Sequence, residues 1–430
     1  MKITIPYGKA FLSAEMEDRY SFEELSVSDA GPSGEKAGTD IVRAAMESPC
    51  DSPRLRDLAV GKKDAVILLS DHTRPVPSRE ILPLMLRELR DGNPDIDVTL
   101  LFATGCHRAP TREEIEKKIG AETASAEKIA IHDCEGSGNL RLGTLPSGAP
   151  LVVNRIAAET QLLLAEGFIE PHFFAGFSGG RKSVLPGICD KTTVFSNHCS
   201  AFISDKNARA GVLDGNPIHA DMTAAARMIG LKYIVNVILD REKRVRSAFA
   251  GDPVSAHRAG CDELLRLSGV RAREKGDILI SSNGGYPLDQ NLYQSVKCMA
   301  ACEFFSKPDA VYIICCECSD GIGGDDFYSA VKGCQSAEQL LDDIAGVPME
   351  ETRRDQWQYQ ILARVLRGHR VFFVTRPELR DVVRDMKMEY FPSLDAALAA
   401  ARREKGPDAH VVSIPDGVSV LPADPIPRRA

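Results

Sequence analysis

The residues with the clearest chemical potential lie in one segment, EPHFFAGFSGGRKSVLPGI, which follows a short apolar run. Within eleven residues it places His172, the glycines Gly179 and Gly180, and the cations Arg181 and Lys182. Glycines let a backbone approach a phosphate closely, and a lysine offers a point charge or a nucleophilic amine. The spacing matches neither G-x4-G-K-[ST] nor G-x-G-x-x-G, which weakens an ordinary ATPase or NAD-binding interpretation. The alternative is a flexible loop with a surface lysine.

Two further histidines follow predicted strands or short helices. His107 lies in ATGCHRAPTREE, ahead of a helix whose start is marked by Thr111 and Glu114 in capping-box spacing. His198 lies in SNHCS, after a short helical stretch. A loop histidine that titrates near neutrality can act as a general acid or base, although an isolated one is more often only solvated.

An anion-binding loop is indicated by DHTRPVPS, which follows the apolar run DAVILLS. It offers Asp71, Thr73 and Arg74, and Ser78 is a plausible N-cap for the helix that follows. An arginine and a hydroxyl suit an anion. The alternative is a local ion pair between Asp71 and Arg74 that only shapes the turn.

A third group of polar residues stands in the second half of the chain, in NGGYPLDQNLYQSVK. On a helix, Tyr293, Gln294 and Lys297 would occupy neighbouring positions and could hold a small hydroxy-carboxylate. A solvated polar helix face explains the same pattern. Trp357, the single tryptophan, lies in RRDQWQYQILARVL, where core packing is the simpler interpretation.

The elements that must position these groups are short apolar runs alternating with helical patterns, from DAVILLS to HVVSIPDG. This order predicts an α/β fold with mostly parallel sheets, and ligands bind beyond the carboxyl ends of such strands. A chain of 430 residues predicts two domains with an active-site cleft between them. The charged segment 266–276 suggests a boundary near Arg271. We expect a cofactor-binding unit over 1–270, a second unit over 275–405, a tail 408–430 that packs back on the first, and loose order in DPIPRRA.

Composition limits the possible partners. The net charge of −8 argues against a broad nucleic-acid or anionic-membrane surface, and no apolar stretch approaches a membrane span. The N-terminus lacks the pattern of a signal peptide, so we expect a cytoplasmic protein with reduced thiols. Among the twelve cysteines, the isolated pair Cys315 and Cys318 indicates buried strand thiols more than a zinc site, and Cys298 and Cys302 fit one helix face.

Taken together, DHTRPVPS, ATGCHRAPT, EPHFFAGFSGGRKSVLPGI, SNH, NGGYPLDQNLYQSVK and DQW resemble the nickel-dependent lactate racemase family nearly end to end. The resemblance implies nickel held by a pyridinium-3-thioamide-5-thiocarboxylic acid mononucleotide. Lys182 matches the covalent anchor of that cofactor, and His198 matches the histidine that completes the nickel coordination. His107 and His172 match the family's acid/base pair.

The remaining matched residues surround the cofactor and the substrate. Those that would hold the ribose and phosphate are Asp71, Thr73, Arg74, Gly179 and Gly180. Those on the substrate side are Tyr293, Gln294, Lys297 and Trp357. The implied reaction is racemisation of D- and L-lactate by hydride transfer through a keto acid, with one histidine serving each enantiomer.

Several alternatives stay open. The same mechanism fits malate, an aryl-lactate or a sugar acid, because only the shape of the pocket separates such substrates. A cofactor-binding protein without catalysis and a zinc hydrolase are the other classes, and the absence of an H-E-x-x-H pattern disfavours the hydrolase. The expected partners are a 2-hydroxy acid and separate cofactor-synthesis enzymes, since nothing in the chain indicates that it builds the cofactor itself.

Overall fold

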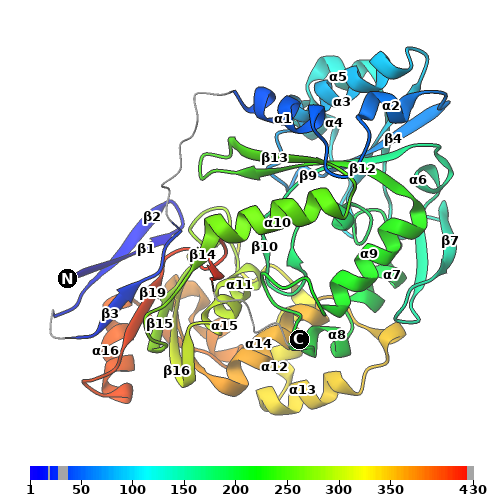
Figure 1. Ribbon diagram of the computed structural model, residues 1–430. Helices are drawn as coiled ribbons and strands as arrows, with labels where there is room; N and C mark the ends of the chain where they lie inside the picture. The colour runs from blue at the N-terminus through cyan, green and yellow to red at the C-terminus, as the bar shows by residue number, and fades with distance from the viewer. Residues whose placement is uncertain (18–19, 28–36, 424–430) are drawn as a thin grey trace.

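The structure is a computed structural model that describes residues 1–17, 20–27 and 37–423. Two six-stranded sheets organise these residues, and Figure 1 shows them in separate lobes with α10 (Ser255–Ser268) lying between. The predicted α/β class with mostly parallel sheets is confirmed. The segment 424–430, for which we expected loose order, lies outside the described residues.

The first sheet has the strand order β13-β12-β9-β4-β5-β6, and only β13 runs antiparallel to its neighbour. Its strands are β4 (Asp64–Ser70), β5 (Asp97–Ala103), β6 (Lys128–Ile131), β9 (Leu163–Phe168), β12 (Leu231–Leu239) and β13 (Val245–Gly251). Every residue of β9 and the five central residues of β4 are buried. This continuous burial is typical of parallel strands covered on both faces.

The second sheet has the order β18-β17-β16-β15-β19-β3, and all its pairings are parallel. Its strands are β3 (Phe22–Glu24), β15 (Gly276–Ser281), β16 (Ser306–Cys315), β17 (Arg370–Val374), β18 (Glu389–Phe391) and β19 (Val411–Ile414). Cys315 and Cys318 are buried free thiols, as expected, and Cys298 and Cys302 are both buried on α11 (Leu292–Cys302).

The strand pairing differs from the expected domain limits at both ends of the chain. The expected first unit included residues 1–24, yet β3 pairs with β19 in the second sheet. The tail is divided, because β19 also belongs to that sheet, whereas β20 (Leu421–Pro422) pairs with β14 (Gly269–Val270) beside α10. Leu421 packs in a cluster with Ile169 and Phe177 of the first lobe. These long-range pairings have no local sequence signature.

Helices cover the sheets and small hairpins fill the edges. Around the first sheet lie α1 (Gly38–Glu47), α2 (Leu55–Ala59), α3 (Ser78–Gly92), α4 (Arg112–Ile119), α5 (Ala121–Ala126), α6 (Arg155–Glu159), α7 (Lys191–Asn197), α8 (Ser200–Ser204), α9 (Pro217–Ile229) and η1 (Gly180–Ser183). With the second sheet lie α11, α12 (Asp325–Gly333), α13 (Ala337–Ala345), α14 (Gln356–Gly368), α15 (Arg380–Asp385), α16 (Leu394–Lys405), η2 (Met349–Glu351) and η3 (Pro377–Leu379). The hairpins are β1 (Lys2–Tyr7) with β2 (Ala10–Glu15), β7 (Asn139–Thr144) with β8 (Pro150–Asn154), and β10 (Pro171–His172) with β11 (Gly176–Phe177).

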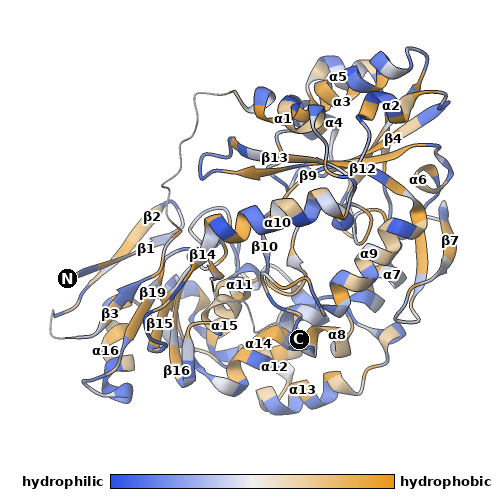
Figure 2. Ribbon diagram, in the orientation of Figure 1, coloured by the Kyte–Doolittle hydropathy of each residue, from blue (hydrophilic) through white to orange (hydrophobic). Residues whose placement is uncertain are grey.

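The two lobes share apolar packing. One cluster of buried residues joins Leu68 and Ala165 of the first sheet to Leu279 and Ile314 of the second. Figure 2 shows β4 and β12 largely in the hydrophobic colour, in keeping with their burial. Burial of apolar side chains contributes about 25 cal/mol per Å², so this shared cluster ties the lobes together and fixes the strand ends that face the space between them.

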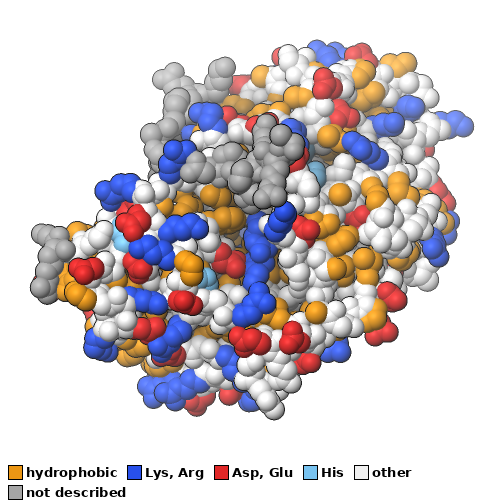
Figure 3. Space-filling view, turned by 60° about the horizontal axis from the view of Figure 1, so that its bottom comes forward, with side chains coloured by type: hydrophobic (Ala, Val, Ile, Leu, Met, Phe, Trp, Pro, Cys, Tyr) orange, Lys and Arg blue, Asp and Glu red, His pale blue; other side chains and the backbone are white. Residues whose placement is uncertain are grey.

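The surface is mixed in charge. On the face shown in Figure 3, acidic and basic side chains are interspersed, apart from a short column of Lys and Arg near the centre. Among the described residues, none of the helices has the length and apolar character needed to cross a membrane.

Candidate functional site

Three of the predicted loops leave neighbouring strands of the first sheet. The strands β9, β4 and β5 are adjacent and parallel, so the loops that carry His172, Asp71 and His107 emerge at one edge. The capping box expected after the third loop is confirmed: the Thr111 hydroxyl accepts from the Glu114 N–H at 3.2 Å, and the Glu114 carboxylate accepts from the Thr111 N–H at 2.8 Å. The helix α4 therefore begins after His107 and leaves it in the loop.

The loop after β4 is held differently from our expectation. Ser78 does not cap α3; Pro77 precedes the helix and makes no side-chain capping bond. The Ser78 hydroxyl instead donates to the buried Glu166 carboxylate at 3.0 Å, because β9 places that carboxylate beneath the helix start. Lys118 of α4 donates to the Arg74 carbonyl at 3.1 Å. Together these bonds tie the Asp71 loop to α4 and β9.

The loop after β9 is folded around a buried guanidinium. Arg181 is 3% exposed and donates to the carbonyl oxygens of Ala175 at 2.7 Å and Phe177 at 2.8 Å. These bonds stabilise the hairpin that presents His172 and Phe174. Sequence reasoning treated Arg181 as part of a cationic run, but its side chain turns inward and supports the loop.

The two glycines are required by close contacts with the sheet. Gly179 has φ +76° and Gly180 has φ +52°, where side chains other than glycine are strained. A Cβ on Gly180 would lie 2.7 Å from the His257 ring. The Gly180 N–H donates to the side-chain amide oxygen Oδ1 of Asn236 at 2.7 Å. Asn236 is fully buried in β12. A single amide within the apolar run KYIVNVIL was the sequence feature that could have indicated this hydrogen bond to the glycine loop.

Lys182 lies two residues after Gly180, and burial removes water from around its amine. Burial, together with the charges of Arg181 and Arg74, lowers the pKa of Lys182 well below its ordinary value, although Glu170 opposes this. The ammonium nitrogen lies 5.9 Å from the centre of the Phe174 ring. A lowered pKa favours the neutral amine, which is the nucleophilic form.

His198 ends α7 with one ring nitrogen left free. Its Nδ1 lies 2.7 Å from the Val194 carbonyl oxygen, and since a carbonyl only accepts, Nδ1 carries the proton and Nε2 has a lone pair. Burial and the charge of Lys182 lower the pKa of His198 to about 3. The imidazole is therefore neutral. A backbone bond at one nitrogen is how proteins usually orient a metal-binding histidine.

His172 lies close to His198, with Phe174 between them. The Phe174 ring centre is 4.5 Å from that of His172 and 5.1 Å from that of His198, and both contacts are edge-on. The Ala175 N–H donates to His172 Nδ1 at 3.2 Å, so a neutral ring carries its proton on Nε2. Burial, followed by the charges of Lys182 and Lys297, lowers the pKa of His172 well below its ordinary value.

His107 has the opposite environment. Its side chain is 47% exposed, and its Nδ1 lies 2.6 Å from the carboxylate of Asp71, which is 3% exposed. Thr73 donates to the same carboxylate from its N–H at 2.9 Å and its hydroxyl at 2.5 Å. Burial would raise the pKa of Asp71, but the bonds from His107 and Thr73 outweigh it, and the pKa lies well below its ordinary value.

The second lobe contributes residues from two helices. Asn291 caps α11 by accepting from the Gln294 N–H at 3.0 Å, which sets the register of Tyr293 and Lys297 on that helix. The Trp357 indole N–H on α14 donates to the Tyr293 hydroxyl at 3.2 Å. Burial and the charge of Arg74 lower the pKa of Lys297 to about 8, and Glu170 opposes the shift.

These residues meet those of the first lobe at two places. The Trp357 ring centre lies 5.1 Å from that of His198. A pocket of about 40 Å³ is lined by His172, Phe173 and Glu170 from the first lobe and by Lys297 and Phe304 from the second. The structure thus brings together His172, Lys182, His198, Lys297, Tyr293 and Trp357. His107 contacts Asp71 but none of this group directly, and Gln294 contributes only its backbone to the bonds described here.

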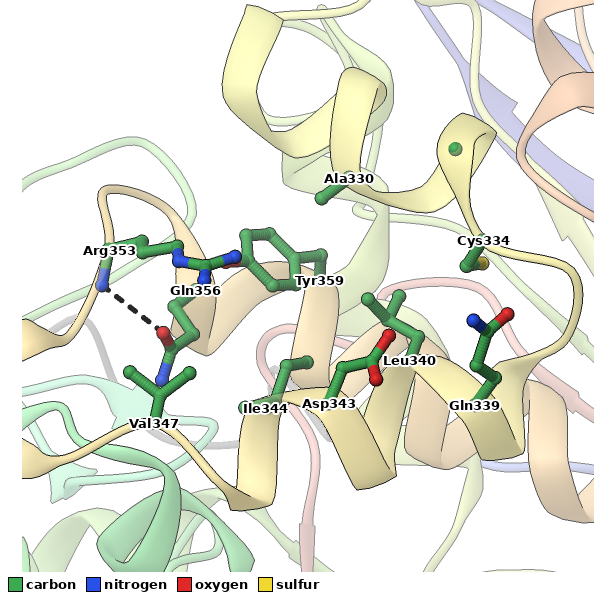
Figure 4. A pocket seen from close by; sticks show the side chains of 11 residues that line it. Ala330, Cys334, Gln339, Leu340, Asp343, Ile344, Val347, Arg353, Gln356 and Tyr359 are labelled. Carbon is green, nitrogen blue, oxygen red and sulfur yellow. Dashed lines mark hydrogen bonds between the residues drawn. The ribbon is translucent and has the colours of Figure 1, made fainter.

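A larger pocket of about 170 Å³ lies elsewhere, among α12, α13 and α14. Figure 4 shows it lined by Leu340, Asp343, Arg353, Gln356 and Tyr359. It contains none of the predicted site residues. Within the described ranges, no group of three or more His, Cys, Asp or Glu side chains is arranged to hold a metal ion.

The fold and the site define an α/β protein with two mostly parallel sheets, in which His172 and Lys182 of the first lobe lie near Lys297 of the second. The chain matches the family described as the lactate racemase N-terminal domain over residues 7–211 and the lactate racemase C-terminal domain over residues 271–422. It therefore belongs to the lactate racemase family.

Relatives agree along nearly the whole chain. A lactate racemase from Thermoanaerobacterium thermosaccharolyticum is 47% identical over 97% of this chain and 98% of its own, and one from Lactiplantibacillus plantarum is 43% identical over 97% and 99%. The structure of the Thermoanaerobacterium lactate racemase apoprotein matches with a TM-score of 0.92 at 45% identity, covering 98% and 99% of the two chains. A Thermotoga maritima protein shares the fold at 17% identity, with a TM-score of 0.63 over 89% of this chain and 96% of its own.

Proposed function

We propose that this protein interconverts the enantiomers of lactate, using nickel bound to a pyridinium mononucleotide that is tethered to Lys182. The observation that carries the proposal is the group formed around the buried Phe174 by the buried His198 and the half-buried Lys182 and His172. It occurs in a chain that is 47% identical over nearly its full length to a protein named lactate racemase.

The residues fit the proposed cofactor on three grounds. The lowered pKa of Lys182 provides the neutral amine that an acyl attachment needs. The free Nε2 of His198 is a suitable ligand for nickel, which binds imidazole well. The backbone at Gly179 and Gly180 has no Cβ and can approach a phosphate, with Arg74 as a nearby cation and Thr73 as a nearby hydroxyl. When bound, the cofactor supplies a pyridinium ring that accepts and returns a hydride.

The chain's own residues then handle protons and binding. We propose that His107 and His172 are the acid/base pair, each serving one enantiomer. Lys297, with Gln294 and Tyr293, holds the carboxylate and hydroxyl oxygen of the substrate, and Trp357 fixes Tyr293. The apolar walls of the interlobe pocket exclude water, which strengthens these charged contacts.

The substrate is the finer part of the proposal. Phe173, Ala300, Ala301 and Phe304 line the interlobe pocket, and these apolar side chains favour the methyl group of lactate over a second carboxylate group. Malate, an aryl-lactate or a sugar acid is the alternative substrate. We further propose a cofactor-binding unit over 1–270 and a second unit over 275–405, amended by the strand pairings of β3 and β19. A cytoplasmic location fits twelve free thiols, and maturation requires separate cofactor-synthesis enzymes.

A racemisation assay tests the proposal. The protein is produced together with the cofactor-synthesis enzymes, its nickel content is measured, and the optical rotation of L-lactate, D-lactate, malate and phenyl-lactate is followed. We expect loss of optical activity fastest with lactate, from either enantiomer. Protein that contains nickel and the cofactor but leaves all four compounds optically unchanged would be a binding protein, and the proposed function would be wrong.

A further inference from the structure

Glu170 lines the interlobe pocket just beyond the end of β9. Its main chain is fixed, because the Glu170 N–H donates to the Ser178 hydroxyl and the Glu170 carbonyl accepts from the Ser178 N–H, both at 2.9 Å. Glu170 is half-buried, and within residues 1–17, 20–27 and 37–423 its carboxylate makes no hydrogen bond or ion pair. A half-buried charge without a partner among these residues acts on whatever enters the pocket.

The second lobe contributes Lys297 to the same pocket. The negative charge of Glu170 reaches both Lys297 and Lys182, since it opposes the lowering of the pKa of each, and Arg74 acts on both in the other direction. In the proposed function, Lys182 loses its charge when the cofactor acylates it, and Arg74 faces the phosphate. Of these three cations, Lys297 is the one left to hold a substrate carboxylate. A second carboxylate on the same molecule would then meet the charge of Glu170.

The apolar side chains of the pocket do not select by charge alone. Phe173, Ala300, Ala301 and Phe304 offer no hydrogen-bonding side-chain group, so they disfavour a carboxylate and also a neutral amide of the same shape. A fixed negative charge disfavours only the carboxylate.

We propose that Glu170 is a specificity-determining residue: its charge excludes 2-hydroxy acids that carry a second carboxylate and restricts the site to monocarboxylates. This inference rests on the proposed function. It adds a cause of selectivity that acts through charge rather than through the shape of the pocket.

The size of the effect follows from Coulomb's law. Two like charges about 6–10 Å apart change binding by about 10- to 100-fold at an effective dielectric constant of about 20. Glu170→Gln keeps the shape of the side chain and removes its charge, so it should relieve this repulsion. Glu170→Asp keeps the charge and should retain the selectivity.

The first test measures binding and needs no turnover. Succinate and succinamate lack the 2-hydroxyl group and have nearly the same shape, but succinamate has a neutral amide in place of the second carboxylate. Trp357 is the single tryptophan, and its ring centre lies 5.1 Å from that of His198, so its fluorescence reports occupation of the site. In protein loaded with the cofactor, succinamate should bind more tightly than succinate. Glu170→Gln should narrow this difference by about 10- to 100-fold.

Two variants serve as controls for the titration. Glu170→Asp should keep the preference for succinamate. Glu159→Gln, which removes an exposed carboxylate of α6 that pairs with Arg155, should leave both dissociation constants unchanged. A preference that Glu170→Gln leaves intact, or that Glu159→Gln reduces as much, overturns the proposal.

The second test measures racemisation. The ratio of kcat/KM for malate to that for lactate should rise by about 10- to 100-fold in Glu170→Gln and in neither control. Equal loss of turnover with both acids, at an unchanged ratio, would place Glu170 in the chemical step or in cofactor binding and would overturn the proposal. A protein that racemises none of the acids but keeps the charge-dependent preference for succinamate would contradict the proposed function and support this inference, so the two failures are distinguishable.

Discussion

His107 and His172 are chemically the same group in two contrasting environments. His107 is half-exposed and bonded through Nδ1 to a buried carboxylate. His172 accepts a backbone N–H at Nδ1, packs edge-on against Phe174, and has two lysines nearby that disfavour its protonation. The first environment places an anion against the ring, whereas the second lowers the pKa of His172. If His107 and His172 are the two bases, as we propose, this contrast predicts that they are not equivalent.

The largest effect should come from Lys182→Ala, which changes the surroundings of His172 but not the bond between His107 and Asp71. Its charge affects the pKa of His172 and His198, whereas the bond between His107 and Asp71 does not involve it. We expect complete loss of the covalent cofactor and of racemisation, because Lys182 is the proposed attachment point and Lys297, the other amine at the site, belongs to the second lobe. Intact-protein mass spectrometry checks the attachment, and Lys182→Arg, which keeps a charge but has no nucleophilic amine, is the control. Cofactor attached to the alanine variant would contradict the assignment of the anchor.

The second largest effect should be the loss of bound nickel in His198→Ala. His198 packs edge-on against Phe174, as His172 does. Its Nδ1 is bonded to the Val194 carbonyl, which leaves the lone pair of Nε2 for a metal. Loss of a ligand should lower nickel affinity by at least about the 10- to 100-fold found for outer-shell partners. Elemental analysis after dialysis measures this. His219→Ala, which removes a half-buried histidine on α9 of the first lobe, should retain the metal; equal nickel in both variants would show that His198 is not a ligand.

A smaller effect is expected from Trp357→Phe in the second lobe. This change keeps a ring near His198 but removes the N–H that donates to the Tyr293 hydroxyl. One neutral hydrogen bond contributes about 0.5–1.5 kcal/mol, so KM should rise by about 2- to 10-fold while kcat changes little. Steady-state kinetics with both enantiomers measures this. A fall in kcat with an unchanged KM would instead place Trp357 in the chemical step.

Much of the framework was predictable from local pattern. Apolar runs separated by helical segments predicted the parallel sheets, and the carboxyl-edge rule explains why the loops after β9, β4 and β5 emerge at one edge. The capping box at Thr111 was also readable from spacing. The roles of the site residues came from family resemblance, and they stay predictions here.

Other features depend on contacts between distant segments. Nothing near Phe22 indicates that β3 joins the second sheet, since its partner is about 390 residues away in sequence, at Val411. The inward turn of Arg181, the support of Gly180 by Asn236, and the bond from Ser78 to Glu166 likewise depend on tertiary packing. Local preference placed Ser78 at a helix cap, and a buried acceptor 88 residues later took its hydroxyl instead.

The most direct test of the account mixes each histidine variant rapidly with each pure enantiomer of lactate. Cofactor-loaded His107→Ala and His172→Ala should both lose about 10²- to 10⁴-fold in steady-state turnover in either direction, because a racemase needs both bases. In single turnovers, followed by cofactor absorbance, each variant should still respond to one enantiomer, and the two should differ in which one. If both variants respond alike to both enantiomers, or if either keeps near-normal turnover, the two-histidine account is wrong.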